Sequence, residues 1–539
     1  MSADLESSPA SPVAASAPAL SAPARSARSQ VAVGKHGAVA AGHPLAAQAA
    51  LEVLRDGGNA VDAVIAGSAV QCVAEMPWCG LGGDAFAIIH AADGEVLCFN
   101  GSGVAPMGIT GALGSRDKVP RHGMLSVGVP GIVDAWDQLA ERLGTRPLGR
   151  LLAPAIVCAE SMTFDARLVR AFSALVGQPG CDALQALGGS VRLGDRFTQA
   201  DLAATLRTIA GDGRDGFYRG RVAEAIAAHA HSLGGALGID DLGAHAGEWT
   251  APLSARYRDT TVFVPPPVSM GVLLLVALRL VERAMPEGLP RDPARLVDFL
   301  VRVKHVAFDE ALPLLGDPRR SSFDPVGLLC DEWIAGHRPP VQEAIGGSGS
   351  DTTSIAVTDV QGNSVSFIHS LFNEFGSRVL VPGTGIVLND RLANLHVDAE
   401  SPNGLEPGKR PMHTLHGYIA RNDDGRVIAG ATPGGRGQVQ TNLQVLLNIF
   451  DHGDSIGDAI DRPRWVNGLP RRAPDDDTLY VEASFDPAQA AQLAEWGRRV
   501  ETAENEADDH FGACTIVERE GGQCRAAADH RRHASAVAW

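Results

Sequence analysis

The sequence lacks an excess of positive charge, a membrane-length apolar run and paired cysteines. Its 539 residues carry a formal net charge of -17, which disfavours nucleic acid or an anionic membrane surface as a partner. The strongest apolar stretch, Val272 to Leu278, is far shorter than the roughly 20 residues of a membrane helix. The eight cysteines form no CxxC pair, so we expect reduced thiols. No continuous apolar run precedes Arg25 as a secretory signal would, and we expect a cytoplasmic protein.

Most standard catalytic motifs are absent as well. The chain contains no GxSxG turn, no GxxxxGK[ST] phosphate loop, no GxGxxG before a helix and no HExxH, which removes several large enzyme classes. His413 and His416 lie within MHTLHGYIA, a segment typical of a strand. Residues three apart on a strand point to opposite faces, so this pair does not indicate a metal site. We expect neither a metal nor a cofactor.

The first part of the chain combines a low-complexity tail with a mainly helical region. Residues 1–30 are rich in Ala, Ser and Pro and lack the large apolar side chains that offset ordering entropy, which predicts a disordered tail. From His43 to Val73 the pattern indicates a helix, a glycine stop and a second helix. Glycines 80, 82 and 83 precede a short apolar strand, where we expect a close backbone approach. Residues 130–345 are mainly helical by pattern.

The character of the sequence changes at GGSGS, residues 346–350, which has the composition of a flexible linker. Everything after it has the pattern of sheet. Residues 354–358 and 364–368 alternate on either side of Gln361-Gly362-Asn363, which predicts a β-hairpin. Thr352 and Thr353 stand where the first strand of this hairpin begins.

A set of ordered blocks makes the chain recognisable. The segment DTTSIAVTDVQGNSVSFIHSLFNEFGS, residues 351–377, resembles the start of the small subunit of gamma-glutamyltranspeptidases, in which the first Thr becomes a new N-terminus by autoproteolysis. Further blocks in family order are AGHPLAAQAALEVLRDGGNAVDA, GLGGDAF, VGVPG, PPPVSMG, VPGTGIVLND, EPGKRP and TPGGRGQVQTNLQVLLNIFDHG. The resemblance covers nearly everything from about residue 31 to the end, and on it the chain is identified as a member of this family of N-terminal nucleophile hydrolases.

The resemblance implies an α/β fold with four layers, αββα, in which two stacked sheets lie between helical layers. It also implies self-cleavage at the Asp351–Thr352 bond. The products would be a large subunit, residues 31–351 with the tail before it, and a small subunit, residues 352–539, and both would contribute strands to one structural unit. A helix-rich first part and a strand-rich region after residue 352 agree with this fold class.

Chemistry explains why such a threonine must be at an N-terminus. A hydroxyl is a weak nucleophile, and a free α-amino group with a pKa of roughly 7.7–8.0 can accept its proton near neutral pH. Before cleavage that amine is locked in a peptide bond, so the hydroxyl of Thr352 would first attack the preceding carbonyl. Hydrolysis of the resulting ester would release the amine. The alternative for Thr352 is an ordinary strand threonine.

Two further groups are implied by the resemblance. The backbone N–H groups of Gly434 and Gly435 would form an oxyanion hole for the tetrahedral intermediate, and the alternative is a plain turn. Ser370 aligns with a family hydroxyl that hydrogen-bonds the nucleophile, and the alternative is an ordinary strand serine.

Several family residues that grip the α-carboxylate and α-amine of a glutamyl unit are replaced in this chain. Each grip is a charge-assisted hydrogen bond worth roughly 1.5–3 kcal/mol, so their joint loss would change specificity by orders of magnitude. The positions concerned are Ser102 for the family's carboxylate-binding Arg, Phe372 for an Asn unless Asn373 takes its place, Asn394 for the amine-binding Asp, and His413-Thr414 for a Ser-Ser pair.

Arg391 aligns with a neutral or acidic family position and either meets a substrate carboxylate or is a solvated surface arginine. Together with the motifs FNGSG, KRPMHT and PGG-x-GQ, the replacements are similar to a divergent branch of the family that includes oxamate amidohydrolase. The leading hypothesis is therefore an amidohydrolase or acyl transferase for a small amide. Two alternatives are an authentic gamma-glutamyl transpeptidase or glutathione hydrolase, and an inactive scaffold relative. The sequence leaves open whether the protein forms a homo-oligomer.

Overall fold

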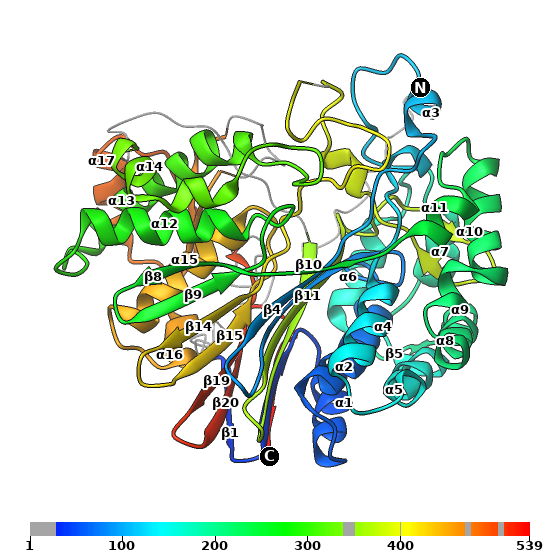
Figure 1. The fold of residues 1–539 in the computed structure, drawn as a ribbon, viewed down its shortest axis with the longest axis horizontal. Coiled ribbons are helices and arrows are strands. Elements are labelled where there is room, and N and C mark those ends of the chain that lie inside the picture. The colour runs from blue at the N-terminus through cyan, green and yellow to red at the C-terminus, as the bar shows by residue number, and fades with distance from the viewer. Residues whose placement is uncertain (1–27, 338–350, 399, 469–475, 505–510) are drawn as a thin grey trace, which may run out of the picture.

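Two seven-stranded sheets pack face to face, and a layer of helices covers the outer face of each sheet (Figure 1). The computed structural model describes residues 28–337, 351–398, 400–468, 476–504 and 511–539. This arrangement has the four layers of the predicted αββα class. The predicted tail up to residue 27 and the predicted linker at 346–350 lie outside the described residues, whereas Gln30, which we expected in the tail, begins a strand.

Every neighbouring pair within the two large sheets is antiparallel. The first sheet has the order β1 (Gln30–Gly34), β20 (Gln523–Ala528), β19 (Thr515–Glu520), β15 (Val427–Ala431), β14 (Tyr418–Asn422), β9 (Thr260–Val264), β8 (Leu253–Tyr257). The second has the order β21 (Ser535–Ala538), β2 (Gly37–Ala41), β10 (Asp351–Asp359), β11 (Ser364–Phe372), β3 (Asp84–His90), β4 (Val96–Gly101), β7 (Glu248–Thr250). Strands from before and after residue 352 therefore share both sheets.

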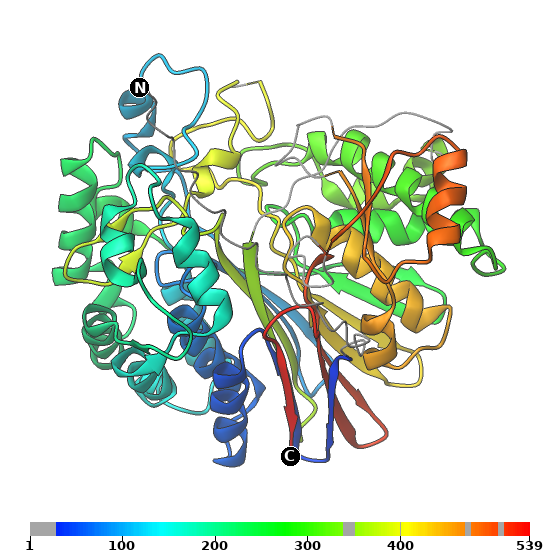
Figure 2. The same ribbon diagram turned by 180° about the vertical axis from the view of Figure 1, so that it is seen from behind.

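The two helical layers are seen from the opposite side in Figure 2. The layer on the second sheet contains α1 (Pro44–Arg55), α2 (Ala60–Ala74), α4 (Ile132–Leu143), α5 (Leu148–Glu160), α6 (Ala166–Ala174), α7 (Asp182–Gly188), α8 (Ala200–Asp212), α9 (Asp215–Tyr218), α10 (Gly220–Ser232) and α11 (Ile239–Ala244). The layer on the first sheet contains α12 (Gly271–Ala284), α13 (Pro293–His305), α14 (Asp331–Gly336), α15 (Gly437–Phe450), α16 (Ile456–Asp461) and α17 (Pro487–Glu495). Helix α3 (Ile109–Leu113) packs beside the segment around Leu392.

Three small sheets complete the fold: β5 (Met162–Thr163) with β6 (Arg196–Phe197), β12 (Leu380–Val381) with β13 (Ile386–Val387), and β16 (Trp465–Asn467) with β17 (Leu479–Val481) and β18 (Val500–Thr502). None of the helices within the described ranges combines the length and the apolar character that crossing a membrane requires.

Side-chain alternation along β10 explains how one strand serves two cores. Ile355 and Val357 point into the cluster beneath α2, whereas Ala356 points between the two sheets. The inter-sheet cluster consists largely of alanines, among them Ala38, Ala429 and others, and small side chains let the sheets approach closely. The central strands are thus buried on both faces.

The structure confirms several local predictions and corrects one. The helix, glycine stop and helix after His43 are α1 and α2, and the predicted hairpin is β10 with β11. The close backbone approach is real, because a Cβ on Gly83 would lie 2.5 Å from the carbonyl oxygen of Ser370. The expectation of sheet alone after residue 350 is wrong: α15, α16 and α17 follow it, and their apolar faces cover the first sheet.

Candidate active site

Thr352 is the second residue of β10, where pairing with β11 is irregular. The register shifts between Asp351 and Thr353, so Thr352 faces two residues of β11, Ser370 and Leu371, as in a β-bulge. Its side chain is fully buried, and its Oγ1 has no hydrogen-bond partner among the described residues. Nη1 of Arg532 donates to the carbonyl oxygen of Thr352 at 3.2 Å. The backbone at this position is held while the hydroxyl is left unpaired.

The neighbouring residue, Thr353, is clamped from the side of α2. Its Oγ1 donates to Oε2 of Glu75 at 2.7 Å and accepts from Nε2 of Gln71 at 2.8 Å. Oε1 of Glu75 in turn lies 3.1 Å from Nη1 of Arg167, whose guanidinium stacks 3.5 Å from the ring centroid of Trp78. A buried ion pair thus fixes the strand directly after Thr352.

Ser370 is joined to Arg391 and Asp84 in one buried network. Nη2 of Arg391 donates to Oγ of Ser370 at 3.0 Å, and Nε of Arg391 donates to Oδ2 of Asp84 at 3.2 Å. The other oxygen of Asp84, Oδ1, accepts from the backbone N–H of Gly103 at 2.9 Å. Arg391 and Asp84 are each 1% exposed, which excludes the alternative of a solvated surface arginine. The last guanidinium nitrogen, Nη1 of Arg391, has no partner among the described residues.

Burial sets the electrostatics of this network. It raises the pKa of Asp84, and the Arg391 guanidinium opposes that rise. Burial also lowers the pKa of Arg391, against the pull of Asp84 and of Asp390. Because an isolated buried charge is far more costly than a paired one, the two side chains stabilise each other's charged form.

His413 lies close to the same oxygen of Asp84 that Arg391 contacts, and Thr414 is its neighbour in the chain. Nε2 of His413 is 4.0 Å from Oδ2 of Asp84, and its ring packs edge-on against Phe86. Burial, with the nearby charges of Arg391 and Arg410, places the pKa of His413 well below 6.5, so the imidazole is neutral. Both ring nitrogens of His413 and Oγ1 of Thr414 are buried without a hydrogen-bond partner in the described part of the chain.

The segment carrying His413 and His416 is not the strand we predicted. β14 begins only at Tyr418, and His413 makes a single isolated bridge to Ser269. His416 has its own partners, since its Nδ1 lies 3.0 Å from the carbonyl oxygen of Thr414 and its Nε2 lies 3.2 Å from an amide nitrogen of α15.

Strand β15 brings the glycine pair to the same end of the sandwich as Thr352. Oγ of Ser366 on β11 donates to the carbonyl oxygen of Gly430 at 3.0 Å. Further along, Thr515, which pairs with the last residue of β15, has its Oγ1 2.8 Å from Oγ of Ser354 on β10. Ser366 pairs with Ala356 on β10, and Ser354 is two residues nearer the start of that strand. Strand β15 therefore runs toward the end of β10 where Thr352 lies.

Gly434 and Gly435 follow β15 in a tight turn that leads into α15. Their φ angles are 123° and 58°, in the left-handed region that favours glycine. The carbonyl oxygen of Gly434 accepts from the N–H of Gly437, which closes the turn.

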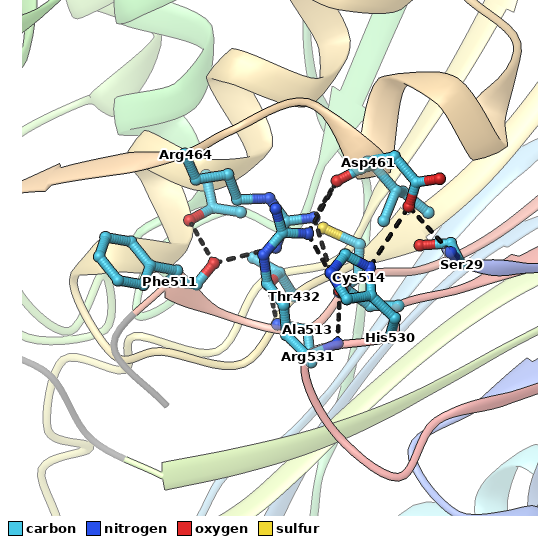
Figure 3. Close-up of polar contacts among 12 residues, drawn as sticks. Ser29, Thr432, Asp461, Arg464, Phe511, Ala513, Cys514, His530 and Arg531 are labelled. Carbon is cyan, nitrogen blue, oxygen red and sulfur yellow. Dashed lines mark hydrogen bonds and ion pairs between the residues drawn. The ribbon is translucent and has the colours of Figure 1, made fainter. Parts of the chain in front are cut away.

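A second buried network holds the residues before this turn (Figure 3). Oγ1 of Thr432 accepts from the N–H of Ala513 at 3.1 Å. Nη1 of Arg464 donates to the carbonyl oxygen of Phe511 at 3.0 Å. Its Nη2 lies 2.6 Å from Oδ2 of Asp529. The segment before the glycine turn is therefore held by buried hydrogen bonds and ion pairs.

Ser102 and Asn394, which we predicted to replace family residues, both make side-chain hydrogen bonds within the protein. Oγ of Ser102 donates to Oδ1 of Asn100 at 2.6 Å, and Nδ2 of Asn394 donates to the carbonyl oxygen of Met412 at 2.6 Å. Both residues lie beside the network, because Gly103 follows Ser102 and the short helix that carries Arg391 ends at Asn394.

Phe372 forms one wall of the network. Its φ of 89° is rare for an aromatic residue, and its ring lies 4.7 Å from the Arg391 guanidinium carbon. Asn373, the residue that would replace it after a one-residue shift, is occupied: its Nδ2 donates to Asp390 at 2.6 Å and its Oδ1 accepts from Arg121 at 3.1 Å.

Two side-chain groups among the described residues have spacing that suits a metal ion, but hydrogen bonding accounts for both. Cys72, Cys79 and His369 form the buried group, and Cys79 donates to a carbonyl oxygen of α2 at 3.2 Å while burial raises its pKa. The thiol of Cys79 therefore keeps its proton, whereas a metal ion binds the thiolate.

The second group is His43, Asp165 and His533. Nδ1 of His43 accepts from the N–H of Leu45 at 3.2 Å, so its proton is on Nε2, which faces Oδ2 of Asp165 at 3.4 Å. Nδ1 of His533 is 3.3 Å from the same oxygen. A carboxylate held between two imidazoles explains this group without a metal.

Sequence reasoning missed Asp84, Glu75 and Arg532. Asp84 and Glu75 are rare as fully buried residue types unless paired, but no local pattern reveals their partners. The available signal was an acidic residue directly after a glycine run in GLGGDAF.

Comparison with known proteins identifies the family and the fold. Residues 46–539 match the sequence model of the family described as Gamma-glutamyltranspeptidase. The chain is 34% identical over 528 residues to an oxamate amidohydrolase proenzyme of Klebsiella pneumoniae, covering 94% of this chain and 99% of that relative. It is 33% identical to a glutathione hydrolase-like YwrD proenzyme of Bacillus subtilis, covering 94% and 99%. The crystal structure of cephalosporin acylase from Bacillus halodurans superposes with a TM-score of 0.88 at 33% identity, covering 96% of this chain and 98% of that one.

Proposed function

This chain belongs to the gamma-glutamyltranspeptidase family, and we propose that it is a self-processing amide hydrolase whose nucleophile is Thr352. The unpaired, buried Oγ1 at the start of β10 supports this assignment. The relatives named above are proenzymes of an oxamate amidohydrolase and a glutathione hydrolase-like protein, and both names describe precursors.

Self-cleavage would occur at the Asp351–Thr352 bond. The hydroxyl of Thr352 attacks the preceding carbonyl carbon, the peptide nitrogen leaves as the new α-amine, and water hydrolyses the ester. The large subunit, residues 31–351 with the tail before it, and the small subunit, residues 352–539, stay together because both contribute strands to both sheets.

In the mature enzyme the α-amine of Thr352 takes the hydroxyl proton as the oxygen attacks the substrate amide. We assign Ser370, which lies on β11 where its register with β10 shifts, to hold that hydroxyl. The N–H groups of Gly434 and Gly435 receive the developing oxyanion. The amine then protonates the leaving nitrogen, and water releases the acyl group.

We assign the substrate to small amides that carry a carboxylate, and Arg391 is the observation that supports this most. Its Nη1 is buried and has no protein partner in the described structure, while its Nη2 meets Ser370 Oγ. A substrate carboxylate that accepts from Nη1 would be bound by the same guanidinium that contacts Ser370, on the strand next to Thr352. His413, 4.0 Å from Asp84, and its neighbour Thr414 supply further buried polar atoms without a partner in the described structure.

A gamma-glutamyl substrate suits the site less well. Ser102 and Asn394 stand where the resemblance implies charged clamps, and both side chains are bonded within the protein. Asp84 is the nearest acidic group to Arg391, but both of its oxygens already accept hydrogen bonds. Among the residues described around Arg391, every carboxylate already accepts hydrogen bonds from the protein. None is therefore free to bind the ammonium group of a glutamyl substrate.

Purified protein should first be examined on a denaturing gel and by mass spectrometry of the new N-terminus. We expect the 56.2 kDa band to be replaced by two bands, with Thr352 first in the smaller. A band that stays uncut after prolonged incubation would favour an inactive scaffold instead.

The processed protein should then be assayed for ammonia release from oxamate and for cleavage of a gamma-glutamyl anilide. Turnover of oxamate with little turnover of the anilide is the expected result. Robust turnover of the anilide would overturn the substrate assignment and favour a glutathione hydrolase.

A further inference from the structure

Asp84 lies at the centre of the polar network, yet it touches neither the nucleophile nor the oxyanion turn. It begins β3 directly after Gly82 and Gly83, where the backbone is pressed against its neighbours: a Cβ on Gly82 would lie 2.1 Å from the carbonyl oxygen of Val387. The main chain that carries Asp84 is therefore held rigidly. Its carboxylate is 1% exposed and cannot move toward solvent.

The two carboxylate oxygens of Asp84 have different partners. Oδ1 accepts from the N–H of Gly103, which fixes the plane of the carboxylate. Oδ2 then receives Nε of Arg391 at 3.2 Å. A guanidinium is planar and rigid, so holding Nε leaves only one orientation for the two Nη groups. In that orientation Nη2 donates to Ser370 Oγ and Nη1 is left without a partner among the described residues.

His413 does not compete for this role. Its Nε2 is 4.0 Å from Oδ2 of Asp84, beyond hydrogen-bond distance, and its pKa is well below 6.5 because of burial, so it carries no charge. Arg391 is the cation that Asp84 holds directly.

We propose that Asp84 is a positioning and specificity residue: it aims the Arg391 guanidinium so that one nitrogen orders Ser370 and another receives the substrate carboxylate. This inference rests on the proposed function of the site. It explains how residues of β3 and of the short helix at 391–394 can bind a substrate carboxylate although Ser102 stands where the family is expected to have an arginine. It also makes the choice of substrate depend on a residue that never touches the substrate.

The test is Asp84→Asn, which keeps an acceptor for Gly103 but turns a donor toward Arg391. The chain offers a matched control in Asp134. That carboxylate is fully buried, and it also accepts from an arginine Nε, that of Arg214 at 2.6 Å, and from a glycine N–H, that of Gly247 at 2.7 Å. Asp134→Asn should therefore reproduce the general cost of losing such a pair without disturbing Arg391.

Two readouts are measured on the processed proteins. The first is the ratio of kcat/KM for oxamate to that for oxamide, in which an amide replaces the carboxylate. We expect this ratio to fall at least tenfold in Asp84→Asn, mainly through KM, and to stay within twofold of wild type in Asp134→Asn. The second is calorimetric binding of oxalate, which needs no turnover, and we expect at least tenfold weaker binding in Asp84→Asn alone.

The outcomes separate this proposal from the proposed function. Wild-type protein that hydrolyses oxamate, with an Asp84→Asn variant that keeps the wild-type ratio and oxalate affinity, would overturn the role of Asp84 and leave the function intact. Wild-type protein that neither hydrolyses oxamate nor binds oxalate would overturn both.

A second variant covers a failure of Asp84→Asn to fold or self-cleave. Arg391→Lys keeps the positive charge beside Asp84 but cannot reach Ser370 and the substrate together. It should lose the preference for oxamate over oxamide at least tenfold, and retention of the preference would overturn the proposal.

Discussion

Replacing Arg167 with methionine tests how firmly the strand that follows the proposed nucleophile must be held. Arg167 and Glu75 form a buried ion pair, with side chains 8% and 3% exposed and a separation of 3.1 Å. Removing one partner of such a pair typically costs about 3–5 kcal/mol, because the other charge stays buried. Glu75 would keep its hydrogen bonds from Thr353 and Gln71, and methionine can still cover Trp78, so we expect the lower end, about 3 kcal/mol.

Part of this cost should appear in the rate of self-cleavage. Glu75 holds Thr353 directly, and Thr353 follows the residue whose hydroxyl must reach the preceding carbonyl. Each 1.4 kcal/mol of lost transition-state stabilisation slows a reaction about tenfold. Part of the lost free energy destabilises the folded precursor, and only the remainder raises the barrier to cleavage. We therefore expect Arg167→Met to self-cleave about 10- to 100-fold more slowly.

The assay is the loss of full-length band with time on a denaturing gel, together with the thermal unfolding midpoint. Arg207→Met is the matched control, because its ion pair with Glu160 is exposed, with side chains 52% and 49% accessible, and should contribute little. Adding Glu75→Gln to Arg167→Met should recover part of the stability, since the buried charge is gone. Wild-type cleavage and unfolding in Arg167→Met would refute the reasoning.

Three further predictions follow from other parts of the molecule. Thr352→Ala should leave the precursor uncut, whereas Thr352→Ser, which keeps the hydroxyl, should still yield two bands; cutting of the alanine variant would place the scissile bond elsewhere. The hydrogen bond to Asp165 raises the pKa of His533 above 6.5, so the stabilisation is complete below that pH and is lost as the pH rises through the raised value. His533→Ala should therefore lower the free energy of unfolding near pH 5.5 but not near pH 9. The loss should be no more than about 1 kcal/mol because the imidazole is half exposed. Gly82→Ala places a Cβ 2.1 Å from the carbonyl oxygen of Val387 and should destabilise the fold by at least about 1–3 kcal/mol, measured by denaturant titration.

Much of the architecture was accessible from local pattern. The hairpin of β10 and β11 and the pair α1 and α2 follow from side-chain periodicity and glycine stops, which act over a few residues. The family blocks added the αββα class that periodicity alone did not distinguish. Helix α15 was missed because polar residues such as Gln440 and Gln444 interrupt the apolar pattern, although both side chains are buried and donate to backbone carbonyl oxygens of Asn467 and Trp465.

By itself, the sequence determined that a threonine stands at the start of a strand after a linker-like segment, and it predicted that the glutamyl clamp positions are replaced. These are properties of single positions and of neighbours along the chain. Only the tertiary structure decided that Arg391 is buried, that it pairs with Asp84 across 307 positions, and that Thr353 is held by Glu75 across 278. A charged residue carries no local sign of its partner, because burial and pairing arise only when distant strands and helices pack together.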